Sequence, residues 1–158
     1  MKGSPSTEAD FGLLFALAFR CYVDHLHEEL QAAGFVGVRA AFGPVLRALR
    51  AGDSTLVGLA RDLGVTKQAV ARVLDDMRAD GLIDQTPDPA DGRARLLSLT
   101  ARGRAMVDTA IGIGARFESA LADELGDRRT RELRAGLEHV VERAGAAGEL
   151  AARRVRSM

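Results

Sequence analysis

Four polar side chains that can contact a nucleic acid lie together at the start of one predicted helix. They are Thr66, Lys67, Gln68 and Arg72. The amide of Gln68 offers the paired donor and acceptor that match the edge of adenine, and the guanidinium of Arg72 matches the edge of guanine. Thr66 and Lys67 begin the helix, where free backbone amides and positive charge favour a phosphate. These residues predict a surface that reads bases in the major groove.

A second charged group follows in a segment rich in turn-forming residues. Residues 87–92 read Pro-Asp-Pro-Ala-Asp-Gly between two short apolar runs, which predicts the projecting loop of a β-hairpin. Arg93 and Arg95 lie at this loop, and the negative potential of the minor groove attracts arginine. Asp91 is two residues from Arg93 and is expected to hold its guanidinium through a charge-assisted hydrogen bond. The loop therefore predicts a DNA-contacting wing that Asp91 orders.

The spacing of apolar residues predicts the elements that position these side chains. Helical spacing is found over residues 10–33, 38–51, 56–63, 66–79, 100–125 and from 127 onward. Ser54 or Thr55 is expected to cap the third of these helices. Proline at position 44 predicts that the second helix starts late or kinks. Alternating or short apolar runs at 82–86 and 95–99 predict the two strands of the hairpin.

The predicted fourth helix also has an apolar side. Val70, Val73, Leu74 and Met77 follow the i, i+3, i+4, i+7 pattern of a buried face. With that face turned inward, Gln68 and Arg72 project from the opposite side. Two helices joined by a short glycine turn form a helix-turn-helix unit, whose second helix enters the major groove in DNA-binding proteins.

Residues 40–104 resemble the winged helix-turn-helix of MarR-family transcription regulators. The motifs that carry the resemblance are LA..LGV before the recognition helix, TKQAVARVLDDM within it, GLI at the strand entry, DPADGRAR in the wing and LSLTARG after it. The resemblance implies that Asp91 and Arg93 are the acid and base of the wing that reach toward the minor groove. Gly92 departs from the arginine often found in the family at that place, which implies the loss of one contact and a more mobile tip.

The fold class expected from these elements is mainly α with a small β-hairpin wing, a winged helix-turn-helix flanked by long dimerisation helices. The expected DNA-binding domain is residues 38–100, the helical dimerisation region is 10–37 with 101–158, and residues 1–9 form a disordered lead. The resemblance implies a homodimer on a palindromic double-stranded DNA operator and a small-molecule effector, with no cofactor. Repression is expected over activation, because a compact dimer without a second effector domain acts simply by occupying a promoter.

Composition sets few limits on the function. The chain has 22 basic and 22 acidic residues, but a net charge of zero does not exclude DNA binding through one face. No apolar run approaches the roughly 20 residues of a membrane-spanning helix. The acidic residues Glu8 and Asp10 make the N-terminus a poor signal peptide, so a cytoplasmic protein without a membrane partner is expected.

Other candidate sites receive weaker support from the sequence. Cys21 is the single cysteine and is expected to be a small buried hydrophobe rather than a redox sensor. His25 and His27 are two residues apart, so on a helix they point apart and make a poor metal pair. No catalytic motif is present, and an enzyme is not expected. Four further side chains are candidates for a ligand pocket, although their spacing favours a core or dimer seam: Phe11, Phe15, Tyr22 and His139.

One alternative function stays open at this stage. The predicted recognition helix contains two acids, Asp75 and Asp76, and a third, Asp80, follows its last residue. Acidic side chains repel phosphates, so these residues favour a helical dimeric module that binds protein through its winged domain.

Overall fold

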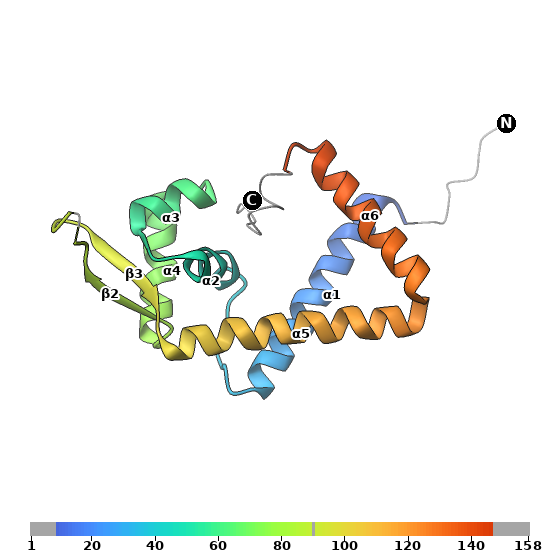
Figure 1. The fold of residues 1–158 in the computed structure, drawn as a ribbon, viewed down its shortest axis with the longest axis horizontal. Helices are drawn as coiled ribbons and strands as arrows, with labels where there is room; N and C mark the ends of the chain where they lie inside the picture. Colours follow the sequence, from blue (N-terminus) through green and yellow to red (C-terminus); the bar gives the residue numbers. More distant parts are fainter. Residues whose placement is uncertain (1–8, 90, 147–158) are drawn as a thin grey trace. The chain divides into compact units, whose positions relative to one another are not determined.

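The computed structural model describes residues 9–89 and 91–146, and the chain divides into two compact units, residues 1–38 and 39–158. In the first unit, helix α1 runs from Phe11 to Ala32 (Figure 1). The side chain of Asp10 caps it by accepting a hydrogen bond from the Leu13 amide at 2.9 Å. The expectation of a disordered lead falls almost wholly on residues outside the described part of the chain and stays a prediction.

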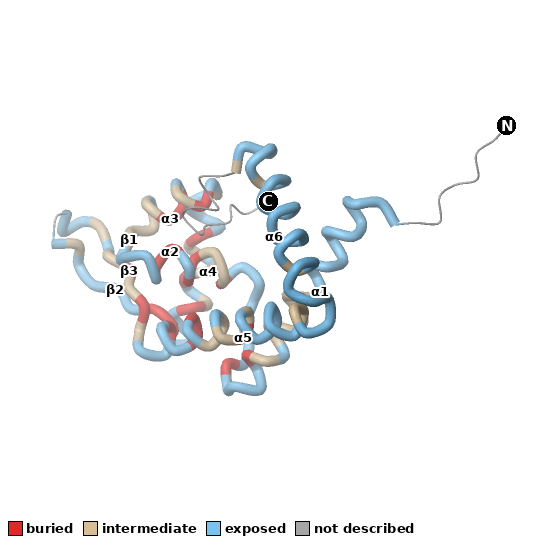
Figure 2. The backbone as a smooth tube through the Cα atoms, turned by 45° about the vertical axis from the view of Figure 1, so that its right-hand side comes forward, coloured by how far each residue is buried: buried red, intermediate tan, exposed pale blue. Residues whose placement is uncertain are grey.

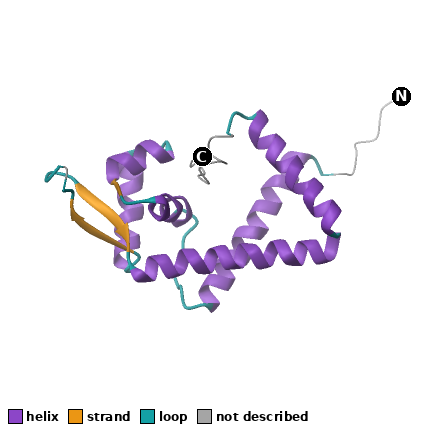
Figure 3. Cartoon of the chain, viewed as in Figure 1, coloured by secondary structure: helices purple, strands orange, loops and turns teal. Residues whose placement is uncertain are grey.

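The second unit contains the remaining helices and one small antiparallel sheet. In chain order these elements are α2 (Phe42–Ala51), β1 (Ser54–Thr55), α3 (Leu56–Leu63), α4 (Lys67–Ala79), β2 (Ile83–Pro87), β3 (Arg95–Leu99), α5 (Ala101–Leu125) and α6 (Asp127–Arg143). Figure 3 shows the hairpin of β2 and β3 beside the short helices of this unit. The predicted fold class, mainly α with a small β wing, is confirmed.

The sheet has one strand more than the sequence predicts. Its order is β1-β3-β2, with both neighbours antiparallel to the central strand. Ser54 and Thr55 pair with Leu97 and Leu96 of β3, so the two residues expected only to cap a helix also close the edge of the sheet. A two-residue strand has no periodicity of its own, and its identity depends on the partner strand.

Threonine side chains begin three of the helices in this unit. Thr55, Thr66 and Thr100 accept hydrogen bonds from the backbone amides of Gly58, Ala69 and Gly103 at 3.1, 3.2 and 2.9 Å. Each bond satisfies one of the amides that a helix start leaves without a partner. The sequence prediction of these starts is therefore confirmed. Helix α2 begins at Phe42, so Pro44 lies in its first turn, where the missing amide costs nothing.

Buried apolar side chains from α2, α3, α4, the sheet and the first half of α5 form the core of the second unit (Figure 2). On α4, Val70, Leu74 and Met77 are buried as predicted, and Val73 is half-buried. These side chains fix which side of α4 faces outward.

The start of α5 packs very closely on the start of β2. The Thr100 hydroxyl donates to the Gly81 carbonyl at 2.7 Å, and the Thr100 amide donates to the Leu82 carbonyl at 3.1 Å. A Cβ atom on Gly103 would lie 2.0 Å from the Leu82 carbonyl oxygen. Only glycine fits at this position, and the contact joins the wing to the long helix.

Helix α6 has no buried residue among those described. An ion pair of 2.7 Å between Arg134 and Glu118 connects it to α5. Its apolar residues Leu133, Leu137 and Val140 are 44 to 47% exposed. Among the described residues, no helix is long and apolar enough to cross a membrane.

Candidate nucleic-acid interface

The polar side of α4 is fully available at the surface of the second unit. Gly64, with φ of 68°, makes the left-handed turn that ends α3, and Thr66 then caps α4. Lys67, Gln68 and Arg72 are all exposed on the side opposite the buried stripe. The helix-turn-helix geometry thus presents the predicted base-reading residues to the solvent.

Apart from Thr66, whose hydroxyl caps α4, the predicted interface residues have side chains without a protein partner among the described residues, unlike most nearby arginines. Within the described part of the chain, the side chains of Lys67, Gln68, Arg72, Arg93 and Arg95 make neither an ion pair nor a hydrogen bond. Arginines that form ion pairs in the second unit include Arg39, Arg50, Arg61 and Arg78, and Arg104 donates a hydrogen bond to the Leu99 carbonyl. Arg47 on α2 is exposed and also lacks a partner among the described residues. Charges without a partner are the ones that can neutralise phosphates without first breaking an internal bond.

The wing is a β-hairpin, and the Asp91 carboxylate accepts a hydrogen bond within its loop. β2 and β3 pair from Ile83 with Leu99 to Pro87 with Arg95. Asp91 accepts a hydrogen bond from the Arg93 amide at 3.0 Å, and the Ala94 amide donates to the Asp91 carbonyl at 2.8 Å. In the described residues, Asp91 therefore contacts the backbone of Arg93 and not its guanidinium. Asp91 still lies where it can order the loop, but the expected charge-assisted pair is absent and the Arg93 head group extends freely.

Two acids of the recognition helix form ion pairs that the sequence analysis did not predict. The Asp75 carboxylate accepts from Arg78 at 2.8 Å, and Asp76 forms an ion pair with Arg39. The Arg39 guanidinium also lies 6.0 Å from the ring centre of Phe42. The i, i+3 spacing of Asp75 and Arg78 was the signal for the first pair. The second joins residues 37 apart, and no local pattern indicates it.

Cys21, His25 and His27, which the sequence makes weak candidates for a redox or metal site, all lie on α1. Cys21 is exposed, so the expectation that it is a buried hydrophobe is wrong for this chain. The described residues contain no cluster of three His, Cys, Asp or Glu side chains suited to a metal ion, and this holds for the surroundings of His25 and His27.

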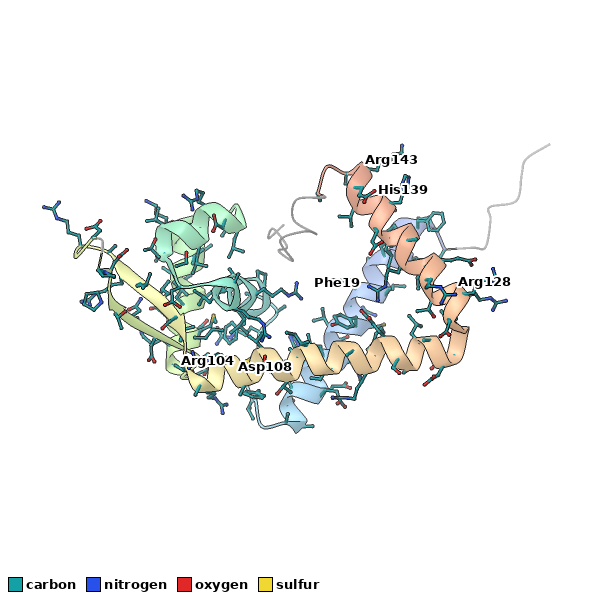
Figure 4. The ribbon with its side chains drawn as sticks, viewed as in Figure 1. Phe19, Arg104, Asp108, Arg128, His139 and Arg143 are labelled. Atoms are coloured by element: carbon teal, nitrogen blue, oxygen red, sulfur yellow. The ribbon has the colours of Figure 1, made fainter. Side chains whose placement is uncertain are left out.

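A cavity of about 450 Å³ lies where the end of α2 meets β3 and the start of α5. Its lining residues are Leu49, Arg50, Gly52, Asp53, Leu99, Arg104 and Asp108. Figure 4 labels Arg104 and Asp108 on α5, and Asp108 forms an ion pair with Arg50 across the cavity edge. None of the four side chains named as candidates for a ligand pocket (Phe11, Phe15, Tyr22 and His139) lines this cavity. His139, also labelled in Figure 4, lies on α6.

Comparisons with known proteins agree with this geometry. Residues 43–94 match the MarR family. The reduced form of MarR from E. coli is 26% identical, with a TM-score of 0.71, and the match covers 86% of this chain and 99% of that one. A mutant E. coli MarR in complex with operator DNA is 26% identical, with a TM-score of 0.65 and coverage of 84% and 99%.

A mutant MepR from S. aureus bound to an oligodeoxyribonucleotide is 21% identical over 87% of this chain and 99% of that one, with a TM-score of 0.61. At that identity the likeness concerns the fold alone. No curated protein sequence matches the chain.

Proposed function

We propose that the chain is a DNA-binding transcription regulator of the MarR type, and that it acts as a ligand-responsive repressor that binds a palindromic operator as a homodimer. In this proposal Gln68 and Arg72 read bases in the major groove, and Thr66 and Lys67 contact phosphate. Arg93 and Arg95 reach the minor groove from a wing that Asp91 orders.

The proposal depends on one observation, which is that the exposed cations of α4 and the wing form no ion pair with other described residues. Lys67, Arg72, Arg93 and Arg95 have no protein partner among the described residues, while several other arginines of the domain are held in ion pairs. Although the net charge of the chain is zero, the helix and the wing therefore carry positive charges that no internal ion pair neutralises. Binding at these side chains releases counterions from DNA at no cost in internal ion pairs.

The homodimer is supported by apolar side chains that one chain leaves exposed. On α1, Phe11 is 77% exposed and Phe19 is 67% exposed. On α6, Leu133 and Leu137 lie one turn apart and are 45% and 44% exposed. Exposed apolar stripes of this kind mark surfaces that another protein covers. Two copies related by a twofold axis would present two recognition helices to two half-sites.

The alternative function, a protein-binding winged module, loses its main support in the structure. Its argument depends on the acids of α4, but Asp75 is paired with Arg78 and Asp76 with Arg39. Apart from Asp80, which directly follows α4, the unpaired charged side chains of this helix are the cations Lys67 and Arg72, which favours DNA.

The experiment that tests the proposed function measures binding to duplex DNA over a range of salt concentrations. Wild-type protein should bind random duplex at low salt and lose affinity steeply as salt rises, because phosphate contacts release counterions. Replacing both wing arginines (Arg93→Ala and Arg95→Ala) should lower the magnitude of the salt slope by about one to two. The matched control is Arg131→Ala on α6, which removes an exposed cation far along the chain from the wing.

Two results would contradict the proposal. No binding of wild-type protein at low salt would remove DNA as the partner and restore the protein-binding alternative. Equal losses per charge removed, two in the wing variant and one in Arg131→Ala, would show that only total charge matters.

A further inference from the structure

One arginine connects the recognition helix to the wing. Arg78, in the last turn of α4, donates through Nη1 to Oε1 of Gln85 on β2 at 3.0 Å. Through Nη2 it donates to Oδ1 of Asp75, one turn earlier on α4, at 2.8 Å. A guanidinium is planar and has several donors in fixed directions, so one head group fixes two acceptors at once.

The position of Gln85 determines how far along β2 this bridge restrains the strand. The backbone bonds that hold β2 to the end of α4 lie at the turn, where the amides of Gly81 and Leu82 donate to the carbonyls of Arg78 and Met77 at 3.0 and 2.9 Å. Gln85 is three residues beyond Leu82, which is about 10 Å along an extended strand. The bridge therefore restrains β2 well beyond the turn, toward the arginine-bearing loop.

The orientation of the strand also brings Gln85 to α4. Side chains alternate along a strand, so Gln85 shares a face with Ile83, which is buried against the core. Asp75 belongs to the polar side of α4, since it follows Gln68 by seven residues and Arg72 by three. The Asp75–Arg78–Gln85 bridge thus joins the base-reading side of the helix to the wing strand.

We propose that Arg78 is a positioning residue that sets the wing relative to the recognition helix through the Asp75–Arg78–Gln85 bridge. The bridge also cancels the charge of Asp75, which would otherwise repel DNA phosphates. This inference rests on the proposed function, because its effect is on DNA binding. Arg78 and Asp75 are half or more exposed, so the bridge adds little to the stability of the fold. Its loss should change how well the two DNA-contacting parts fit one duplex.

The test is a double-mutant cycle measured on two duplexes. One duplex carries a site selected with wild-type protein from a random pool, and the other has the same length and a scrambled sequence. Gln85→Met keeps the length of the side chain and removes the acceptor without changing charge. It should weaken binding to the selected duplex about fivefold or more, with the salt slope and the melting temperature near those of wild type.

The other variants separate positioning from direct contact. Arg78→Met should weaken binding to the selected duplex more than binding to the scrambled one. The double variant should be no weaker than Arg78→Met alone, since both changes break one bridge. Gln85→Glu keeps an acceptor for Arg78 and should bind within about twofold of wild type.

Two outcomes would overturn the proposal: unchanged affinity in Gln85→Met, or additive losses in the double variant. Failure of the wild-type protein to bind either duplex at low salt would instead overturn the proposed function.

Discussion

At the scale of single residues, the partners of a charged side chain decide what it can do. Lys67 and Arg72 extend from α4 without a protein partner among the described residues, whereas Arg78 on the same helix is bonded to two. All three are basic residues on the polar side of one helix, so the sequence alone does not distinguish them. Only the fold separates side chains that are free to bind DNA from one that is engaged internally.

We expect Gln68→Ala and Lys67→Ala to affect DNA binding in different ways. Gln68 is assigned to a base edge, so its loss should weaken the selected site and relax preference at one position of each half-site. Lys67 is assigned to a phosphate, so its loss should weaken all duplexes alike and lower the magnitude of the salt slope by about one. Fluorescence anisotropy with selected and scrambled duplexes measures both effects. Equal loss on the two duplexes for Gln68→Ala would disprove its base-reading role.

Asp91→Ala should weaken DNA binding without unfolding the protein. The Asp91 carboxylate holds the Arg93 amide at the tip of the wing, so its loss frees the loop and raises the entropy cost of placing both arginines on DNA. Asp91→Asn keeps an acceptor at the same atom and should retain most of the affinity. Titration of the three proteins against the selected duplex tests this, and an Asn variant as weak as the Ala variant would point to a role for the charge itself.

At the scale of elements, the close contact between the start of β2 and the start of α5 predicts that a larger residue at position 103 lowers the free energy of unfolding. A methyl group on Gly103 would lie 2.0 Å from the Leu82 carbonyl oxygen, which is backbone and cannot move aside cheaply. Gly103→Ala should therefore lower the free energy of unfolding by about 3 kcal/mol. Chemical denaturation monitored by circular dichroism measures the change.

Gly43→Ala is the matched control for this prediction. Gly43 lies near the start of α2, and nothing lies within 4 Å of the position its Cβ would take. Alanine there should leave stability unchanged or raise it by about 0.5 kcal/mol. A Gly103→Ala protein as stable as this control would mean that α5 and β2 separate easily.

The sequence predicted most of these elements because their signals are local. Threonine caps, glycine stops and apolar stripes lie within a few residues of the boundaries they specify, and the starts at Thr55, Thr66 and Thr100 followed from them. Strand β1 could not be predicted, since its two residues become a strand only by pairing with Leu96 and Leu97. The Arg39–Asp76 pair and the tight fit at Gly103 likewise join distant segments. The exposure of Cys21 depends on what packs beside α1, which spacing does not encode.

At the scale of the whole molecule, the exposed apolar side chains of α1 and α6 support the proposal that two copies of the chain form a dimer. We expect wild-type protein to be a dimer and the double variant Leu133→Glu and Leu137→Glu to be a monomer. α6 has no buried residue in the described part of the chain, so the charges should leave the winged domain folded. Sedimentation equilibrium gives the mass, and circular dichroism checks the helix content.

The control is Arg131→Glu, which places a negative charge on the opposite side of α6. It should remain a dimer. A Leu133 and Leu137 variant that stays dimeric would remove this stripe from the interface.

The central claim is that the polar side of α4 and the arginine-bearing wing engage one duplex, twice, in a symmetric dimer. Selection of bound sequences from a random duplex pool tests it most directly. The predicted result is an inverted repeat whose half-sites are about one helical turn, roughly 10 base pairs, apart. Enrichment of a single unrepeated site, or of no sequence at all under conditions where the protein is folded, would contradict it.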